Sequence, residues 1–249
     1  LSPMMTHYLE TKKQYPDCIL FYRLGDFYEM FFEDALTASR ELEITLTGKD
    51  CGLEERAPMC GVPYHALEGY LSKLVQKGYK VAIGEQVEDP KTAKGLVKRE
   101  VIRVVTPGTI TNSQALEESK NNYLMGIVYT DGIFGISVAD VSTGDYLVTE
   151  VKSERNLIDE IYKFSPSEII CNEAFYMSGI DLDDLKNRLH AVISDLDNRF
   201  FSDEFCRKLL RDHFHVENLE GLGLSDYETG TIAAGAVLQY LYETQKNSL

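Results

Sequence analysis

FYRLGDFYEMFFEDA, residues 21–35, decides how the first part of this chain folds. The stretch predicts two short β-strands joined at Gly25-Asp26. Successive side chains of a strand point to opposite faces. The second strand should therefore have an apolar core face, made of Tyr28, Met30 and Phe32, and a mixed face, made of Phe27, Glu29 and Phe31.

The mixed face places a large aromatic ring beside a carboxylate. A partly buried edge strand is the simpler explanation. The alternative is that Phe27 is a wedge, because proteins that kink DNA often push an apolar side chain between base steps from the minor groove. Glu29 would lie about 7 Å away on the same face, at roughly 3.3–3.4 Å per residue, within reach of a base edge. An acid among phosphates is unfavourable unless it makes a specific hydrogen bond, so the pair favours contact with a base.

Length and composition indicate a soluble globular protein of two domains. The chain has 249 residues, 44% of them hydrophobic and 26% charged, enough for two separate cores. Its longest aliphatic run, near 232–238, is too short to cross a bilayer, and no signal-peptide pattern opens it. Because it begins at Leu1 and not at Met, we expect an excised part of a longer protein.

The net charge of −15 is unevenly distributed. Residues 1–112 contain 14 Lys and Arg against 16 Asp and Glu, whereas residues 113–249 contain 11 against 24. Any phosphate binding therefore belongs to the first half, and the acidic second half is better suited to protein contacts.

The cysteines are odd in number and widely scattered, without a C-x-x-C motif. This pattern favours buried, reduced thiols in a cytosolic protein over a disulfide framework or a zinc site. The five positions are Cys18, Cys51, Cys60, Cys171 and Cys206.

Helices and strands are expected to alternate in the first half. A helix should begin at Pro3, after the N-cap Ser2, and end before Pro16. The polar segment Thr47–Pro58 predicts a loop. The remaining expected elements are helices over 33–42 and 66–77, the latter ended by Gly78, and strands over 81–87 and 97–105.

The second half predicts a mixed sheet flanked by helices. The polar stretch 112–122 marks a domain boundary. Asp131-Gly132 lies between two strand-like runs, 123–130 and 133–140, and suits a type I′ hairpin turn. The later expected elements are strands over 146–151, 168–171 and 191–195, helices over 157–164 and 183–189, and a final helix from Asp226. The fold class is therefore mixed α/β, with two such domains.

Acidic residues of the second half also allow a nuclease interpretation. YTDG, residues 129–132, resembles the first-strand signature of RNase H-type nucleases, which arrange carboxylates around two metal ions. Asp140, Asp195 and Asp197 could supply the other ligands. However, Asp131 is expected in the hairpin turn, where Asp-Gly is explained by turn chemistry. A metal-dependent nuclease and a pure protein-interaction module stay open as alternatives.

Other motifs carry weaker signals. No G-x-x-x-x-G-K-[ST] motif occurs, and EGLGLSD, residues 220–226, is expected to be a loop and not a nucleotide site. His213-x-His215 lacks a third metal ligand nearby. Basic residues of the first half cluster in two places: Lys49 with Arg56, and Lys91, Lys94, Lys98, Arg99 and Arg103.

Longer motifs identify a family. GDFYEMF (25–31), PMCGVPYHALEGYLSKLV (58–75), VAIGEQVEDP (81–90) and VIRVVTPGT (101–109) closely resemble the N-terminal part of the bacterial MutS family of mismatch-recognition proteins. The resemblance is dense over residues 1–112 and looser over 113–249. It implies a mismatch-recognition domain over 1–112, a linker over 113–122 and a connector domain over 123–249, RNase H-like but without nuclease activity.

The resemblance also implies site residues. Phe27 would stack on a mispaired base from the minor groove, and Glu29 would hydrogen-bond that base. Lys49 and Arg99 fall where the family has basic residues near the mismatch, and Lys49 stands where Arg is common, which removes bidentate contacts there. We hypothesise that Glu29, placed among phosphates, binds as the neutral acid.

The family further implies partners and cofactors. We expect mismatched double-stranded DNA and MutL as partners, and no membrane. The connector would relay signals to an ATPase domain that this chain lacks, so no catalytic residue, metal or cofactor is expected here. ATP, Mg²⁺ and homodimerisation would belong to the full-length protein, whereas this fragment would be monomeric. The location would be the bacterial cytoplasm, with nucleoid association on DNA.

Overall fold

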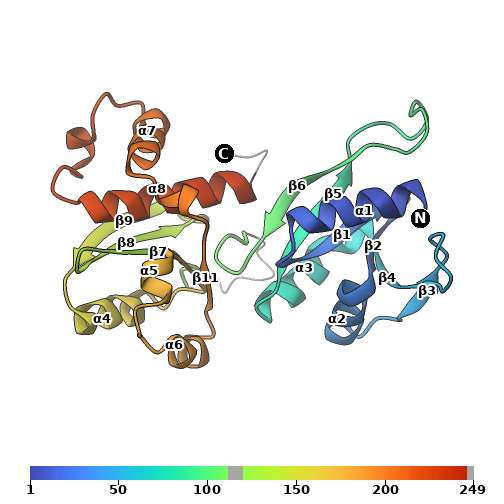
Figure 1. Cartoon of the computed structure of the whole chain (residues 1–249), viewed down its shortest axis with the longest axis horizontal. Coiled ribbons are helices and arrows are strands. Elements are labelled where there is room, and N and C mark those ends of the chain that lie inside the picture. The colour runs from blue at the N-terminus through green and yellow to red at the C-terminus, as the bar shows by residue number, and fades with distance from the viewer. Residues whose placement is uncertain (112–119, 246–249) are drawn as a thin grey trace. The chain divides into compact units, whose positions relative to one another are not determined.

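The computed structural model describes residues 1–111 and 120–245, and these form two compact units (Figure 1). Unit 1 comprises Leu1–Thr106, and unit 2 comprises Pro107–Thr111 together with residues 120–244. Each unit has a mixed sheet with helices on both faces, which confirms the predicted fold class. The predicted linker, 113–122, falls mostly outside the described residues, so the predicted domain boundaries stay predictions.

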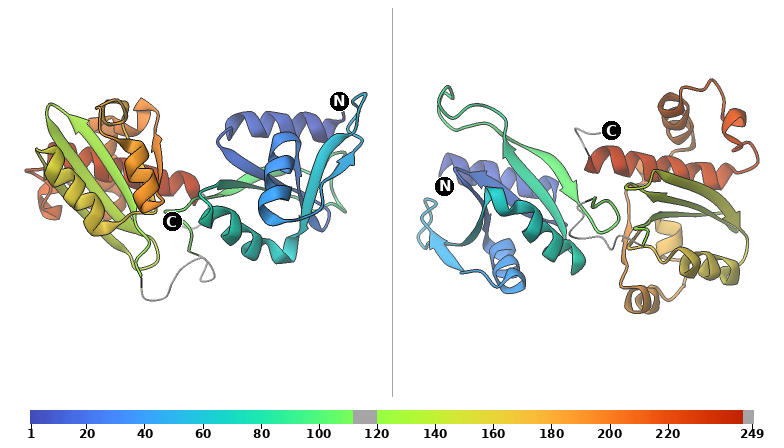
Figure 2. Two further views of the ribbon diagram at one scale, coloured as in Figure 1. Left: turned by 90° about the horizontal axis from the view of Figure 1, so that it is seen from below. Right: turned by 180° about the vertical axis from the view of Figure 1, so that it is seen from behind.

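Unit 1 is built on a six-stranded sheet with the order β3-β4-β2-β1-β5-β6. Only β1 and β5 among these neighbours pair in parallel. Helix α1 lies on one face of the sheet and helices α2 and α3 on the other (Figure 2). The elements are α1 Pro3–Gln14, β1 Cys18–Leu24, β2 Phe27–Phe31, α2 Phe32–Leu42, β3 Thr47–Lys49, β4 Ala57–Pro63, α3 Leu67–Gln76, β5 Lys80–Gln86 and β6 Arg99–Val105.

The expected division of strand β2 into two faces was partly wrong. Tyr28 and Met30 are buried as predicted, but the strand ends at Phe31, and Phe32 begins α2. Phe31, assigned to the mixed face, is only 1% exposed, because Tyr8 of α1 packs edge-on against its ring with centroids 4.9 Å apart. Both faces of the sheet are covered by helices, so the mixed face also enters the core at this end of the strand.

The predicted loop over Thr47–Pro58 was also partly wrong. Residues 47–49 form β3, an edge strand that pairs with β4 from Ala57 onward. An edge strand is held by main-chain hydrogen bonds on one side and does not require the apolar alternation that predicts a half-buried strand. The polar sequence of residues 47–49 therefore does not predict the strand β3.

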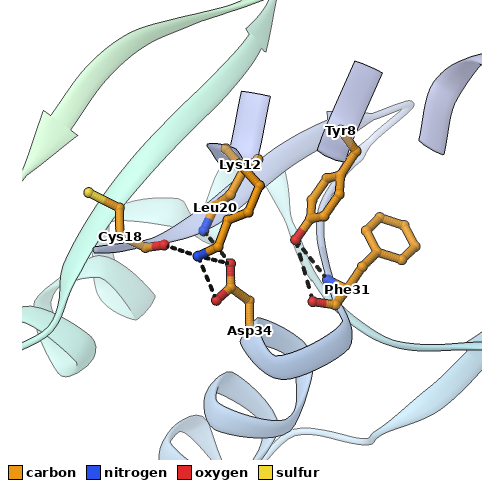
Figure 3. A network of polar contacts seen from close by, with 6 residues as sticks. All are labelled: Tyr8, Lys12, Cys18, Leu20, Phe31 and Asp34. Atoms are coloured by element: carbon orange, nitrogen blue, oxygen red, sulfur yellow. Dashed lines mark hydrogen bonds and ion pairs between the residues drawn. The ribbon is translucent and has the colours of Figure 1, made fainter. Parts of the chain in front are cut away.

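A buried polar network fixes where β2 gives way to α2 (Figure 3). The Asp34 carboxylate, in the first turn of α2, accepts hydrogen bonds from the Leu20 backbone N–H and from Lys12 Nζ, both at 2.9 Å. Lys12 also donates to the Cys18 carbonyl. Beside them, the Tyr8 hydroxyl bonds to the backbone of Phe31. Helix α1, strand β1 and the start of α2 are thereby tied together.

Unit 2 is built on a five-stranded sheet with the order β11-β10-β7-β8-β9. Strands β7, β8 and β9 form an antiparallel meander, whereas β7, β10 and β11 run parallel. Helices α4, α5 and α6 lie on one face and α7 and α8 on the other (Figure 1). The elements are β7 Leu124–Thr130, β8 Ile133–Asp140, β9 Asp145–Val151, α4 Glu154–Phe164, β10 Glu168–Cys171, α5 Glu173–Tyr176, α6 Leu182–Leu189, β11 Val192–Asp195, α7 Asp203–Phe214 and α8 Glu228–Thr244.

The predicted hairpin of unit 2 is confirmed. Asp131 and Gly132 have φ values of 52° and 77°, as both central residues of a type I′ turn require. Helix α8 then packs closely on the sheet: a Cβ on Gly135 of β8 would lie 2.3 Å from the Thr229 carbonyl oxygen. The sequence pattern did not predict α5 or α7.

The cysteines agree with the prediction made from their number and spacing. All five cysteines are buried free thiols, as predicted. Across residues 1–111 and 120–245, no helix combines the length and the apolar character that crossing a bilayer requires.

Candidate nucleic-acid interface

The turn between β1 and β2 holds Phe27 at the tip of a hairpin. Gly25 has φ 58°, the value that a type II′ turn needs at its first central residue. Arg23 donates from Nε to the Gly25 carbonyl at 2.6 Å. On the other side, the Tyr64 backbone N–H donates to the Asp26 carbonyl at 2.9 Å. The turn is therefore anchored on both sides.

Phe27 presents an aromatic ring to solvent. The residue is 46% exposed at the first position of β2, opposite Pro63 of β4. Phe31, four residues on and on the same face, is covered by Tyr8 of α1. Because that cover does not extend to the hairpin tip, the ring of Phe27 is open to a partner.

Glu29 lies on the same face, held by Lys49 of the edge strand β3. The Lys49 ammonium is 3.0 Å from Glu29 Oε1, and the two side chains are 35% and 14% exposed, respectively. Lys49 Nζ also lies 6.0 Å from the centroid of the Phe31 ring. The structure thus places an aromatic ring, a carboxylate and an ammonium group on one face.

Gly61 of β4 leaves bare backbone between Phe27 and Glu29. It pairs with Glu29 across the strands, and a Cβ there would meet Glu29 Cγ at 3.4 Å and Phe27 Cδ1 at 3.8 Å. Gly61 was not among the residues predicted for the site. A glycine inside a strand is a recognised sign of close backbone approach, so the signal was present.

Tyr64 is a second exposed ring beside the hairpin, and sequence reasoning missed it. The residue is 45% exposed, and the guanidinium carbon of Arg23 lies 4.1 Å from the Tyr64 ring centroid, within cation–π distance. Arg23 is itself paired with Glu85 of β5 at 3.1 Å. Stacking across elements depends on the strand order, which residue spacing does not reveal.

Arg99 lies in the interior of unit 1 and not on this face as a free cation. Only 6% of the residue is exposed. Its guanidinium donates to the carbonyls of Arg23 and Val97, at 2.6 and 2.7 Å, and its carbon lies 5.1 Å from the Tyr22 ring centroid. In this position Arg99 supports the base of the hairpin.

The other predicted basic residues are distributed over the sheet edge and one loop. Arg56 donates to the Gly48 carbonyl beside Lys49. On and near β6, Lys98 pairs with Glu100 at 3.1 Å and Arg103 pairs with Glu68 at 2.8 Å. Lys91 and Lys94 are exposed in the β5–β6 loop.

Three of the four carboxylates named for a nuclease, those of Asp131, Asp140 and Asp197, have conformational roles, whereas Asp195 ends strand β11. Asp131 occupies the hairpin turn, as predicted. Asp140 accepts from the backbone N–H groups of Asn122, Ser142 and Thr143, and Asp197 caps a 3₁₀ turn through Arg199 N–H. In the described part of the chain, no group of three or more His, Cys, Asp or Glu side chains is placed to hold a metal ion. The geometry therefore adds no support to the nuclease alternative.

The fold and this face together are typical of a protein that binds nucleic acid through an exposed aromatic ring. It is a mixed α/β protein of two units, of which the first displays an aromatic ring beside a carboxylate on a sheet anchored by a tight hairpin. Such a ring is suited to insertion between stacked bases.

Comparison with known proteins identifies the family. The family model for MutS domain I matches residues 2–114, and that for MutS domain II matches residues 122–249. The chain therefore belongs to the MutS family, which confirms the resemblance drawn from its motifs.

Individual relatives agree over the whole chain. The DNA mismatch repair protein MutS of Lachnoclostridium phytofermentans is 66% identical over 249 residues, covering 100% of this chain and 27% of that relative. The proteins of the same name from Acetivibrio thermocellus and Clostridioides difficile are 55% and 51% identical, and the matches cover 29% and 25% of their lengths. The chain thus spans less than a third of the length of these relatives.

Proposed function

We propose that this chain is the mismatch-recognition and connector part of a MutS protein and that unit 1 reads mispaired DNA. The observation that carries the proposal is the exposed ring of Phe27, held beside Glu29 on an anchored hairpin. The names of the relatives, DNA mismatch repair proteins, support the same role.

Recognition would depend on how easily DNA deforms. Many different mispairs must be accepted, so a single hydrogen-bond code cannot serve. A wedge between base steps costs a few kcal/mol of unstacking at a normal step and less where pairing is already faulty. Base–aromatic stacking returns about 1–3 kcal/mol. Selectivity would therefore be indirect readout, with Phe27 as the wedge and Glu29 as hydrogen-bonding partner of the mispaired base.

Basic residues of unit 1 would hold the DNA backbone. Lys91 and Lys94 are exposed and suited to phosphate contacts, which position a protein without reading sequence. The resemblance named Arg99 as a mismatch-binding residue. As a buried residue, it would contribute by hydrogen-bonding strand β1, which leads into the hairpin. Lys49 stays in the proposed site through its contact with Glu29.

Unit 2 would be the connector domain. Its meander β9-β8-β7, followed by the parallel strands β10 and β11, supports an RNase H-like assignment. The excess of acidic residues in 113–249 makes this unit a poor match for DNA and a better one for protein. We propose that it offers a surface to MutL and relays signals to an ATPase domain. ATP, Mg²⁺ and homodimerisation would belong to the full-length protein, and catalysis would lie outside this chain.

A titration of the intact parent protein tests the proposal. Matched duplexes and duplexes with a single mispair should be compared at two stated salt concentrations, because phosphate contacts make affinity salt-dependent. We expect clear preference for the mispaired duplex. Equal affinity for both would overturn the proposal in favour of a protein-interaction module, and metal-dependent cleavage by the purified chain would favour a nuclease.

A further inference from the structure

Lys49 reaches Glu29 across an intervening strand. In the sheet, β4 lies between β3, which carries Lys49, and β2, which carries Glu29. The Lys49 side chain nevertheless brings its ammonium to 3.0 Å from Glu29 Oε1. Gly61, the β4 residue opposite Glu29, adds no side chain in this space. The ammonium therefore lies over the sheet face and close to the Phe31 ring.

The electrostatic consequence concerns a carboxylate that would have to approach DNA. An unpaired Glu29 would repel the phosphates that flank a mispair. The Lys49–Glu29 pair carries no net charge, so the repulsion is removed without a proton on Glu29. This source of neutralisation differs from the neutral acid that the sequence suggested. Because Glu29 is only 14% exposed, the ammonium also restricts the orientations open to its carboxylate.

We propose that Lys49 is a positioning residue for mismatch recognition, which neutralises and orients Glu29 and does not bind a phosphate. The inference rests on the proposed function, because it assumes that Glu29 meets a mispaired base. It separates two roles for a basic residue at this position. A phosphate ligand contributes to affinity for any duplex, whereas a partner of Glu29 contributes only where Glu29 does.

A double-mutant cycle in the intact parent protein tests this assignment. The variants are Lys49→Met, Glu29→Gln and their combination, and Lys13→Met removes an exposed lysine elsewhere in unit 1 as the matched control. The measured quantities are the ratio of affinities for mispaired and matched duplexes and the dependence of affinity on salt. Thermal melting of each variant shows that it is folded.

We expect Lys49→Met to reduce mismatch preference about five- to tenfold. The effect of losing this partly buried ion pair should be larger than for a surface pair and smaller than for a fully buried one. In the Glu29→Gln background, where no charge needs a partner, the same change should alter the preference less than about twofold. The salt dependence should stay that of the wild type. Lys49→Arg keeps the positive charge and should keep the preference, and Lys13→Met should leave the preference unchanged.

The assignment would be overturned if Lys49→Met reduced mismatch preference by the same factor in the Glu29→Gln background as in the wild type. Loss of preference in a folded Lys49→Arg variant would also overturn it. So would a salt slope shallower by about 0.9 in Lys49→Met, the signature of a lost phosphate contact. The wild-type protein reports separately on the proposed function. If it fails to prefer mispaired DNA, that function is wrong, whereas preference without coupling refutes only the role of Lys49.

Discussion

Two hairpins of this molecule, β1–β2 and β7–β8, each reverse the chain over two residues, and they differ in the residue that comes after the turn. In unit 2, Asp131-Gly132 adopts the positive φ values of its turn, so Asp131 is accounted for by conformation. In unit 1, Gly25 meets the requirement of the turn, and Phe27, the first residue beyond it, is an exposed ring that the turn does not need. A residue left over once folding requirements are met is therefore the stronger candidate for function.

The largest expected effect is a difference in unfolding free energy between alanine variants of two phenylalanines on one face of β2. Phe31→Ala should cost unit 1 about 3–5 kcal/mol of unfolding free energy, because it empties a site under α1. Phe27→Ala, its matched control, should cost about 1 kcal/mol or less, because the residue is 46% exposed and buries only about half of its surface. Native-state hydrogen exchange of unit 1 amides measures both. Equal losses would mean that Phe27 is a core residue.

An intermediate effect is expected in unit 2. Gly135→Ala would place a Cβ 2.3 Å from the Thr229 carbonyl oxygen and should cost about 1–3 kcal/mol through displacement of α8. Gly221→Ala is the control, because a Cβ there meets nothing within 4 Å. Hydrogen exchange should show lost protection in unit 2 with unit 1 unchanged. Wild-type protection in Gly135→Ala would contradict the close packing of α8.

The smallest effect is expected at the second turn. Asp131→Gly should change stability by less than about 1 kcal/mol, since glycine adopts φ 52° freely but gains freedom in the unfolded chain. Thermal melting with and without Mg²⁺ measures this. A metal-dependent stabilisation that the wild type shows and the variant loses would contradict the conformational role of Asp131 and revive the nuclease alternative.

Local patterns predicted those features that local chemistry determines. The turns at Gly25-Asp26 and Asp131-Gly132, and the burial of Tyr28 and Met30, could be predicted from residue types and spacing. These features are determined by residues close together in sequence, so residue types and their spacing are sufficient to predict them.

The rest depends on contacts between distant segments. Phe31 is buried because α1 covers that end of the strand, and the Arg99 guanidinium donates to the carbonyl of Arg23, 76 residues away in sequence. The Lys49–Glu29 pair joins two strands that are separated by a third. None of these could be predicted before the strand order was known.

The affinity of Phe27→Ala for DNA bears most immediately on the proposed wedge. In the intact parent protein, this variant and the wild type should be titrated with matched and singly mispaired duplexes at one salt concentration. Loss of the ring should remove about 1–3 kcal/mol of binding from the mispaired duplex, while weak binding to the matched duplex persists. Undiminished mismatch preference in Phe27→Ala would show that the ring is not the wedge.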